Sequence, residues 1–162
     1  MTGTPLADQP KLHLYGQNGA LTAEWTFTKT VDGVHPTINL DVSAGTKPDY
    51  DWRQKITLQL SVRELPLLAG IGLGLLPKVH FKRPDKGIQI QRQANKLYCT
   101  ASAVDGRKAA LPITIGDAQR LTEFALAILV RGSLSGDAQL VMAALRGSCA
   151  LYSEGSVDRR AG

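Results

Sequence analysis

The chain has 162 residues, of which 43% are hydrophobic, and a net charge of +5 with a pI near 9.4. This length supplies one sizeable core without a second ordinary domain, and two cysteines (Cys99 and Cys149) are too few for a disulfide scaffold. The longest apolar run, residues 65–76, is too short to span a membrane, and residues 1–10 lack the apolar core of a signal peptide. We therefore expect a single domain with reduced thiols, in a bacterial cytoplasm or nucleoid rather than an organelle.

Period-two alternation dominates the first third of the chain. Apolar and polar residues alternate over residues 21–28, 37–42 and 55–60, and Asp32-Gly33 marks a turn between the first two runs. This pattern predicts half-buried antiparallel strands. Trp25 and Phe27 share a face with Leu21, which favours a place in the core over an exposed stacking surface.

A helix is predicted over residues 62–76. Ser61 precedes the apolar run and Glu64 follows three residues later, which is the capping-box pattern, and Pro77 ends the run. Pro66 predicts a tight or kinked start. The glycines at 70, 72 and 74 lie inside this helix rather than between a strand and a helix, so they favour close helix packing over a dinucleotide-binding loop.

The second half repeats the scheme. Strands are predicted over residues 79–83, 87–93, 96–103 and 109–115, followed by a helix over 117–130 whose apolar residues recur at helical spacing. The fold class is therefore α+β, with two β-β-β-β-α repeats forming two antiparallel four-stranded sheets packed with helices. Both helices are apolar around much of their circumference, which favours burial by subunit association.

These elements define the expected organisation of the chain. We expect a flexible N-terminus (1–11), a domain over residues 12–131 with repeats at about 12–77 and 78–131, a helical extension (132–152) with an amphipathic stretch at 137–145, and a disordered tail (153–162).

The positive charge is concentrated in one segment. Residues 78–108 contain eight basic residues and only two acidic ones, whereas residues 1–54 have a net charge of −2. Such segregation is typical of nucleic-acid-binding proteins. The alternative is that these lysines solvate strand edges and turns and block aggregation.

The polar faces of the predicted strands indicate where a nucleic acid would bind. They carry amides and hydroxyls, which can pair with base edges, and Tyr98 alternates away from Leu97 and Cys99, so its ring should be exposed for stacking. We expect phosphate contacts from Lys82, Arg83, Lys86, Arg92, Lys96, Arg107 and Lys108, and sheet contacts from Gln89, Gln91, Tyr98, Lys55 and Trp52. We expect no catalytic residues, metal site or cofactor, because the three histidines are scattered and accompany no nucleophile motif.

One segment is similar to a known family. Tyr50-Asp51-Trp52-Arg53-Gln54-Lys55-Ile56-Thr57-Leu58-Gln59-Leu60-Ser61-Val62-Arg63-Glu64-Leu65 resembles the strand-to-helix segment of the Whirly family of single-stranded-DNA-binding proteins, which has a Tyr-Asp-Trp triplet, an alternating strand and Leu-Ser-Val-x-Glu opening its first helix. Tyr15 to Thr22 resembles the family's first strand, and Leu111-Pro112-Ile113-Thr114 resembles its Ile-Pro-Val-Thr before the second helix. The resemblance covers about residues 12–131.

The resemblance implies two near-perpendicular four-stranded sheets and a homotetramer assembled through the helices. It also implies largely sequence-independent binding of single-stranded DNA along the sheets and between subunits, in DNA protection, maintenance or transcription. The family's Lys-Gly-Lys element is replaced here by Gly16-Gln17-Asn18, so affinity is expected to depend on the 78–108 cluster instead.

Two alternatives remain open from the sequence. An RNA-binding or RNA-annealing protein on the same scaffold would use the same stacking and phosphate contacts. A protein-interaction scaffold without a nucleic-acid ligand would use the C-terminal helix for docking.

Overall fold

The first sheet contains five strands. The computed structural model describes residues 11–161, so the expected flexible N-terminus lies, apart from Lys11, outside the described residues. β1 (Leu12–Tyr15), β2 (Gly19–Thr30) and β3 (Gly33–Thr46) form an antiparallel meander, and β4 (Asp49–Tyr50) and β5 (Ile56–Gln59) both pair with β3. A 3-10 turn, η2 (Trp52–Gln54), lies between β4 and β5. The predicted four-stranded sheet is corrected to five, because β4 has only two residues and shows no alternation in the sequence.

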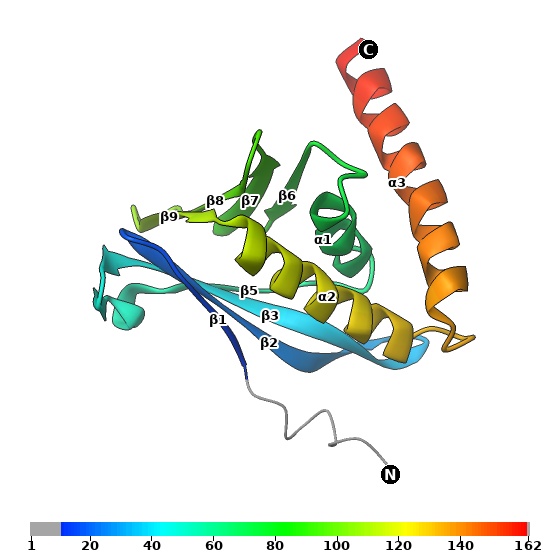
Figure 1. Cartoon of the computed structure of the whole chain (residues 1–162), viewed down its shortest axis with the longest axis horizontal. Helices are drawn as coiled ribbons and strands as arrows, with labels where there is room; N and C mark the ends of the chain where they lie inside the picture. The colour runs from blue at the N-terminus through cyan, green and yellow to red at the C-terminus, as the bar shows by residue number, and fades with distance from the viewer. Residues whose placement is uncertain (1–10, 162) are drawn as a thin grey trace.

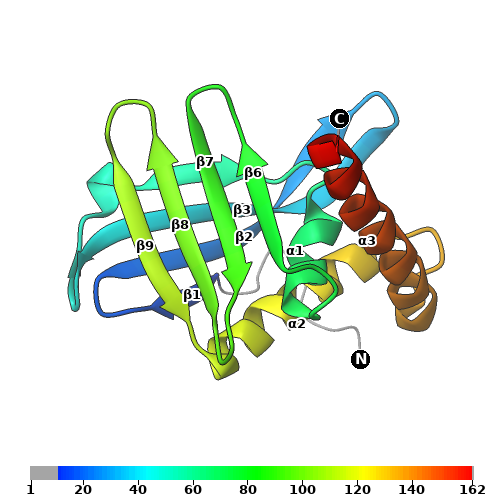
Figure 2. The same ribbon diagram turned by 90° about the horizontal axis from the view of Figure 1, so that it is seen from above.

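Two details of this sheet differ from the sequence analysis. The segment from Tyr15 to Thr22, likened to one first strand, consists of the end of β1, a turn and the start of β2. Trp25 packs partly buried against the core, but Phe27 is 55% exposed and contacts Trp25 edge-on at a centroid distance of 4.5 Å. Phe27 is exposed because it lies in the β2–β3 hairpin, which extends past the second sheet (Figure 2).

The second sheet has the four predicted strands. β6 (Lys78–Lys82), β7 (Lys86–Arg92), β8 (Leu97–Ala103) and β9 (Lys108–Ile113) pair antiparallel in sequence order. Each strand buries alternate residues, such as Val79 and Phe81 in β6, because the side chains of a strand alternate between its faces. The prediction of a second antiparallel four-stranded sheet is therefore confirmed.

The two sheets enclose a common core. Figure 2 shows the strands of the second sheet running across those of the first, and β9 contacts β2 and β3. Gly19 allows β2 and β9 to approach closely, since a methyl group there would overlap the Ala110 carbonyl oxygen. The apolar faces of both sheets meet in one cluster that includes Leu40, Leu58 and Phe81. The opposite face of each sheet is thus left free of the core.

The capping box predicted for the first helix is present. The Ser61 N–H donates to Glu64 Oε1 (2.9 Å), and the Glu64 N–H donates to Ser61 Oγ (3.2 Å). However, α1 spans only Leu65–Gly72, shorter than the predicted 62–76. Pro66 lies in its first turn, where the missing N–H costs no helical bond, and the chain leaves the helix at Gly74, whose φ is +81°.

Glycines in α1 allow the helices to pack closely, as the sequence predicted. α2 (Ile115–Arg131) crosses the first sheet beside α1 (Figure 1), with Leu121, Ala125 and Ile128 buried. A methyl group on Gly72 would overlap the Thr122 side chain of α2. A methyl group on Gly70 would overlap Cys149 of the third helix.

The third helix is longer than predicted. α3 spans Ala138–Ala161 and packs on α1 and α2 through residues such as Met142, Leu145 and Cys149 (Figure 1). The disordered tail expected over residues 153–162 is therefore corrected: residues 153–161 continue α3, and Gly162 lies outside the described residues. No proline interrupts residues 138–161, and extending a formed helix needs no new nucleation.

Both thiols are buried. Cys99 and Cys149 are free and inaccessible, and burial raises the pKa of the Cys99 thiol to about 12, so this cysteine stays protonated. Among the described residues, no helix combines the length and apolarity needed to cross a membrane.

Candidate nucleic-acid interface

The outer face of the second sheet is built by strand alternation. In β6, Val79 and Phe81 point into the core, so Lys78, His80 and Lys82 point outward. The same rule places three alternate residues of each of the other strands on the outer face. They are Gly87, Gln89 and Gln91 of β7, Tyr98, Thr100 and Ser102 of β8, and Lys108, Ala110 and Pro112 of β9. We call these twelve residues of the four strands the sheet-2 face.

The pairing register arranges the sheet-2 face in three rows. One row runs Lys82, Gly87, Ser102, Lys108; the next His80, Gln89, Thr100, Ala110; the third Lys78, Gln91, Tyr98, Pro112. Lysines therefore occupy three corners, and amides and hydroxyls fill the centre. None of the twelve residues is acidic, so no carboxylate on this face would repel a polyanion.

The dimensions of the sheet-2 face follow from strand geometry. Lys82 and Lys108 are separated by three strand spacings, about 14 Å, and Lys78 and Lys82 by four residues along β6, about 13 Å. The lysines thus border an area that can hold a short stretch of single strand.

Tyr98 lies at the edge of a hollow that joins the two sheets. The ring, which was predicted to be exposed, is half-buried. A hollow of about 460 Å³ runs from Tyr98 past Thr100 and Lys108 to Asn18 and Ala44 of the first sheet. The sheet-2 face is therefore continuous with the loop that connects β1 and β2.

His80 is a member of this face that the sequence analysis missed. Partial burial, followed by the charges of Lys82 and Lys78, lowers the pKa of its imidazole below the usual value. The ring is therefore mainly neutral at pH 7. Its alternation with Val79 and Phe81 was the sequence signal that could have placed it outward.

Two of the predicted phosphate-contacting arginines form structural interactions instead. Arg83 donates to both carboxylate oxygens of Glu64 (2.7 and 3.0 Å) and to the Gln59 carbonyl oxygen (2.6 Å). Arg107 donates to the Asp105 carboxylate (2.8 Å) and to the Lys55 carbonyl oxygen (2.8 Å). Both guanidinium groups link the second sheet to the β5 region, which reduces their capacity to bind phosphate.

Burial by itself would raise the pKa of Glu64, but the Arg83 and Ser61 hydrogen bonds outweigh it and hold that pKa below its usual value. Glu64 is therefore ionised at neutral pH and both caps α1 and anchors Arg83.

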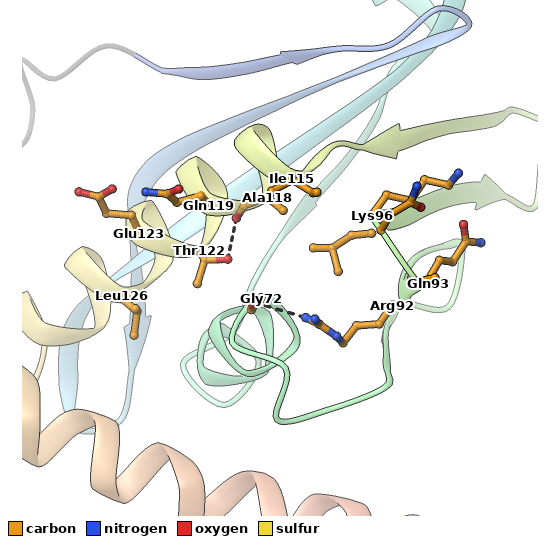
Figure 3. Close-up of a pocket in the computed structure, with 13 residues that line it drawn as sticks. Gly72, Arg92, Gln93, Lys96, Ile115, Ala118, Gln119, Thr122, Glu123 and Leu126 are labelled. Atoms are coloured by element: carbon orange, nitrogen blue, oxygen red, sulfur yellow. Dashed lines mark hydrogen bonds between the residues drawn. The ribbon is translucent and has the colours of Figure 1, made fainter.

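Arg92 and Lys96 lie away from the sheet-2 face. They line a cleft of about 520 Å³ between the β7–β8 turn and α2, together with Gln119 and Glu123 (Figure 3). Arg92 donates to the Ile71 carbonyl oxygen (2.7 Å) at the end of α1. The structure therefore separates these two cations from Lys82 and Lys108.

Lys86 lies at the corner of the second sheet. Its side chain alternates away from the sheet-2 face, but it borders a hollow of about 300 Å³ that also contains Lys82 and Arg83. Lys86 and Lys82 are thus brought together at the β6–β7 turn.

Trp52 and Lys55 belong to the outer side of the first sheet. There, rings stack in a row: His13 on Tyr15 (5.9 Å between centroids), Tyr15 on Tyr50 (5.7 Å), and Tyr50 edge-on to Trp52 (6.3 Å). Lys55 pairs with Asp41 at 3.4 Å on the same side. This aromatic row faces away from the core on the side opposite to Tyr98. The other rings of the row were not among the predicted contacts, although His13 and Tyr15 alternate with the buried Leu12 and Leu14.

Comparison with known proteins identifies a similar fold but no family. No family model and no curated protein matches the chain. A chain in the crystal structures of Trypanosoma brucei MRP1/MRP2 superimposes with a TM-score of 0.58 at 12% sequence identity, over 81% of this chain and 91% of that chain. At this identity the similarity concerns the fold alone.

Proposed function

We propose that this protein binds single-stranded DNA on the sheet-2 face, largely without sequence preference. The observation that carries the proposal is the charge pattern: the face has twelve outward residues and no carboxylate, and the three lysines at its corners have no ion-pair partner in the part of the chain that the structure describes. Lysines attract the phosphates, whereas Gln89, Gln91 and the Tyr98 ring offer hydrogen bonds and stacking to any base.

Single-stranded rather than duplex character is favoured by the shape of this surface. A four-stranded sheet is too wide to enter a DNA groove in the way that a helix or two-stranded ribbon does. Unpaired bases can instead lie flat against the sheet. The similarity of residues 50–65 to the Whirly family points in the same direction, and we propose that the chain is Whirly-like.

We also propose that the protein functions as a homotetramer. Leu140 and Leu151 of α3 and Ile115 of α2 are exposed in the single chain, with Ile115 at 72%. Exposed apolar residues on helices are typical of subunit interfaces. Association would also place several sheet-2 faces along one strand. Sedimentation equilibrium tests this, with a monomer mass at micromolar concentration as the contrary result.

The decisive experiment measures fluorescence anisotropy of labelled 30-mer single-stranded DNA, duplex DNA and single-stranded RNA across a salt series. We expect single-stranded DNA to bind more tightly than duplex, with steep salt dependence. Tighter binding of RNA would instead support the RNA-binding alternative. The absence of binding at low salt would refute both proposals and favour an interaction scaffold, whose partner binding should be lost when residues 135–162 are deleted.

A further inference from the structure

The corner of the second sheet contains a basic hollow that overlaps the margin of the sheet-2 face. It has a volume of about 300 Å³ and lies where the β6–β7 turn meets the end of β8. Its polar lining comes from Lys82, Lys86, Arg83, His80 and Ser102. A space of this size is at the lower end of the range for small-ligand sites.

Gly87 creates the hollow. It occupies the sheet-2 face between Lys82 and Ser102, and a Cβ atom there would lie 2.9 Å from Nε2 of His80. Any side chain at this position would therefore fill the space beside the imidazole. The turn residues Pro84 and Val104 border the hollow on the side away from Gln89. The hollow is therefore closed at the margin of the sheet and does not continue as a groove.

The charges in the hollow match a doubly negative group. None of its lining residues is acidic, and Asp85 of the adjoining turn is exposed outside it. The side chains of Lys82, Lys86, His80 and Ser102 form no hydrogen bond or ion pair within the part of the chain that the structure describes, whereas Arg83 is neutralised by Glu64. The same hollow is thus lined by two lysines, one serine and one histidine whose side chains have no partner among the described residues.

We propose that this hollow binds a phosphate monoester, namely the terminal phosphate of a bound single strand. A monoester carries a charge of about −1.5 to −2 at pH 7, whereas each internal phosphodiester carries only one negative charge. The recess at the margin also suits a chain end, because an internal phosphate needs room for the strand on both sides. The strand-end assignment rests on the proposed function, but the monoester chemistry also fits a free mononucleotide.

The first arm of the test compares three single-stranded oligonucleotides labelled at an internal base, with a 5′-phosphate, a 3′-phosphate or hydroxyls at both ends. We expect one phosphorylated form to bind about tenfold more tightly than the hydroxyl form, the effect of one charge-assisted contact. The K82Q/K86Q variant should lose this ratio, and so should Gly87→Val, which fills the hollow without changing its charge.

The matched control is K78Q/K108Q, which removes the same charge from two other corners of the sheet-2 face. It should weaken all three oligonucleotides equally and preserve the tenfold ratio. Equal loss of the ratio in both double variants would overturn the hollow as the site.

The second arm measures binding of a 5′-mononucleotide through the NMR signals of the His80 ring, in wild type and K82Q/K86Q. Ring shifts in wild type alone, with no end preference among oligonucleotides, would assign the monoester to free nucleotides. Equal oligonucleotide affinities together with an unperturbed His80 ring would overturn the inference while leaving single-strand binding intact. If the wild type binds no single strand but its His80 ring signals shift with the mononucleotide, only the proposed function is overturned.

Discussion

Replacing Lys78, Lys82 and Lys108 by glutamine together should weaken single-strand binding by reducing counterion release. Each phosphate contact to a single strand contributes about −0.7 to the slope of log K against log salt, so losing three contacts should flatten the slope by about 2. At 0.1 M salt this corresponds to roughly a 100-fold loss of affinity. Anisotropy titrations from 50 to 300 mM salt measure both quantities.

The matched control removes three exposed charges outside the second sheet: Lys29 of β2, Arg131 of α2 and Arg146 of α3 are replaced by glutamine. The net charge change is identical, so the control should change the slope little. If the control flattens the slope as much as the sheet-2 variant, net charge rather than this face governs binding and the reasoning is refuted. An unchanged slope in the sheet-2 variant would refute it equally.

Three further predictions concern stacking, packing and pH. Tyr98→Ala should weaken single-strand binding by about 1–3 kcal/mol, because one base loses its stacking partner, whereas Tyr98→Phe should keep the wild-type affinity. Anisotropy titrations measure both affinities. Gly19→Ala should lower the free energy of unfolding by about 1–3 kcal/mol, since the added methyl group meets the Ala110 carbonyl oxygen. The control Gly116→Ala places its methyl group in open space and should not lower the free energy of unfolding, and urea unfolding measures both variants. Because folding lowers the pKa of Glu64, the ionised carboxylate stabilises the folded protein above about pH 4.5, and this stabilisation is lost as the pH falls further. Glu64→Gln should therefore destabilise the protein at pH 7 but hardly at pH 3, and an equal loss at both pH values would contradict the role of the charge.

Much of the fold was predictable because its signals are local. The period-two alternation of β6 to β9 gave their boundaries within about two residues. The capping box was recognised because Ser61 and Glu64 are three residues apart and each side chain accepts from the other's backbone N–H. The end of α1 was not predictable in this way, since Gly74 and the packing of Arg92 on the last turn end the helix before Pro77.

The sequence by itself determined which residues point outward from each strand, because side-chain direction in a strand depends only on parity. It did not determine which cations are free to bind a ligand. Arg107 and Lys55 are 52 residues apart, and Arg83 and Glu64 are 19 apart, yet each pair is joined by hydrogen bonds. Lys82 and Arg83 are adjacent cations in the sequence, but in the tertiary structure Arg83 bonds the Gln59 carbonyl oxygen at the end of β5, whereas Lys82 faces solvent. Charge composition is a property of the chain, but the partner of each charge is decided by long-range packing.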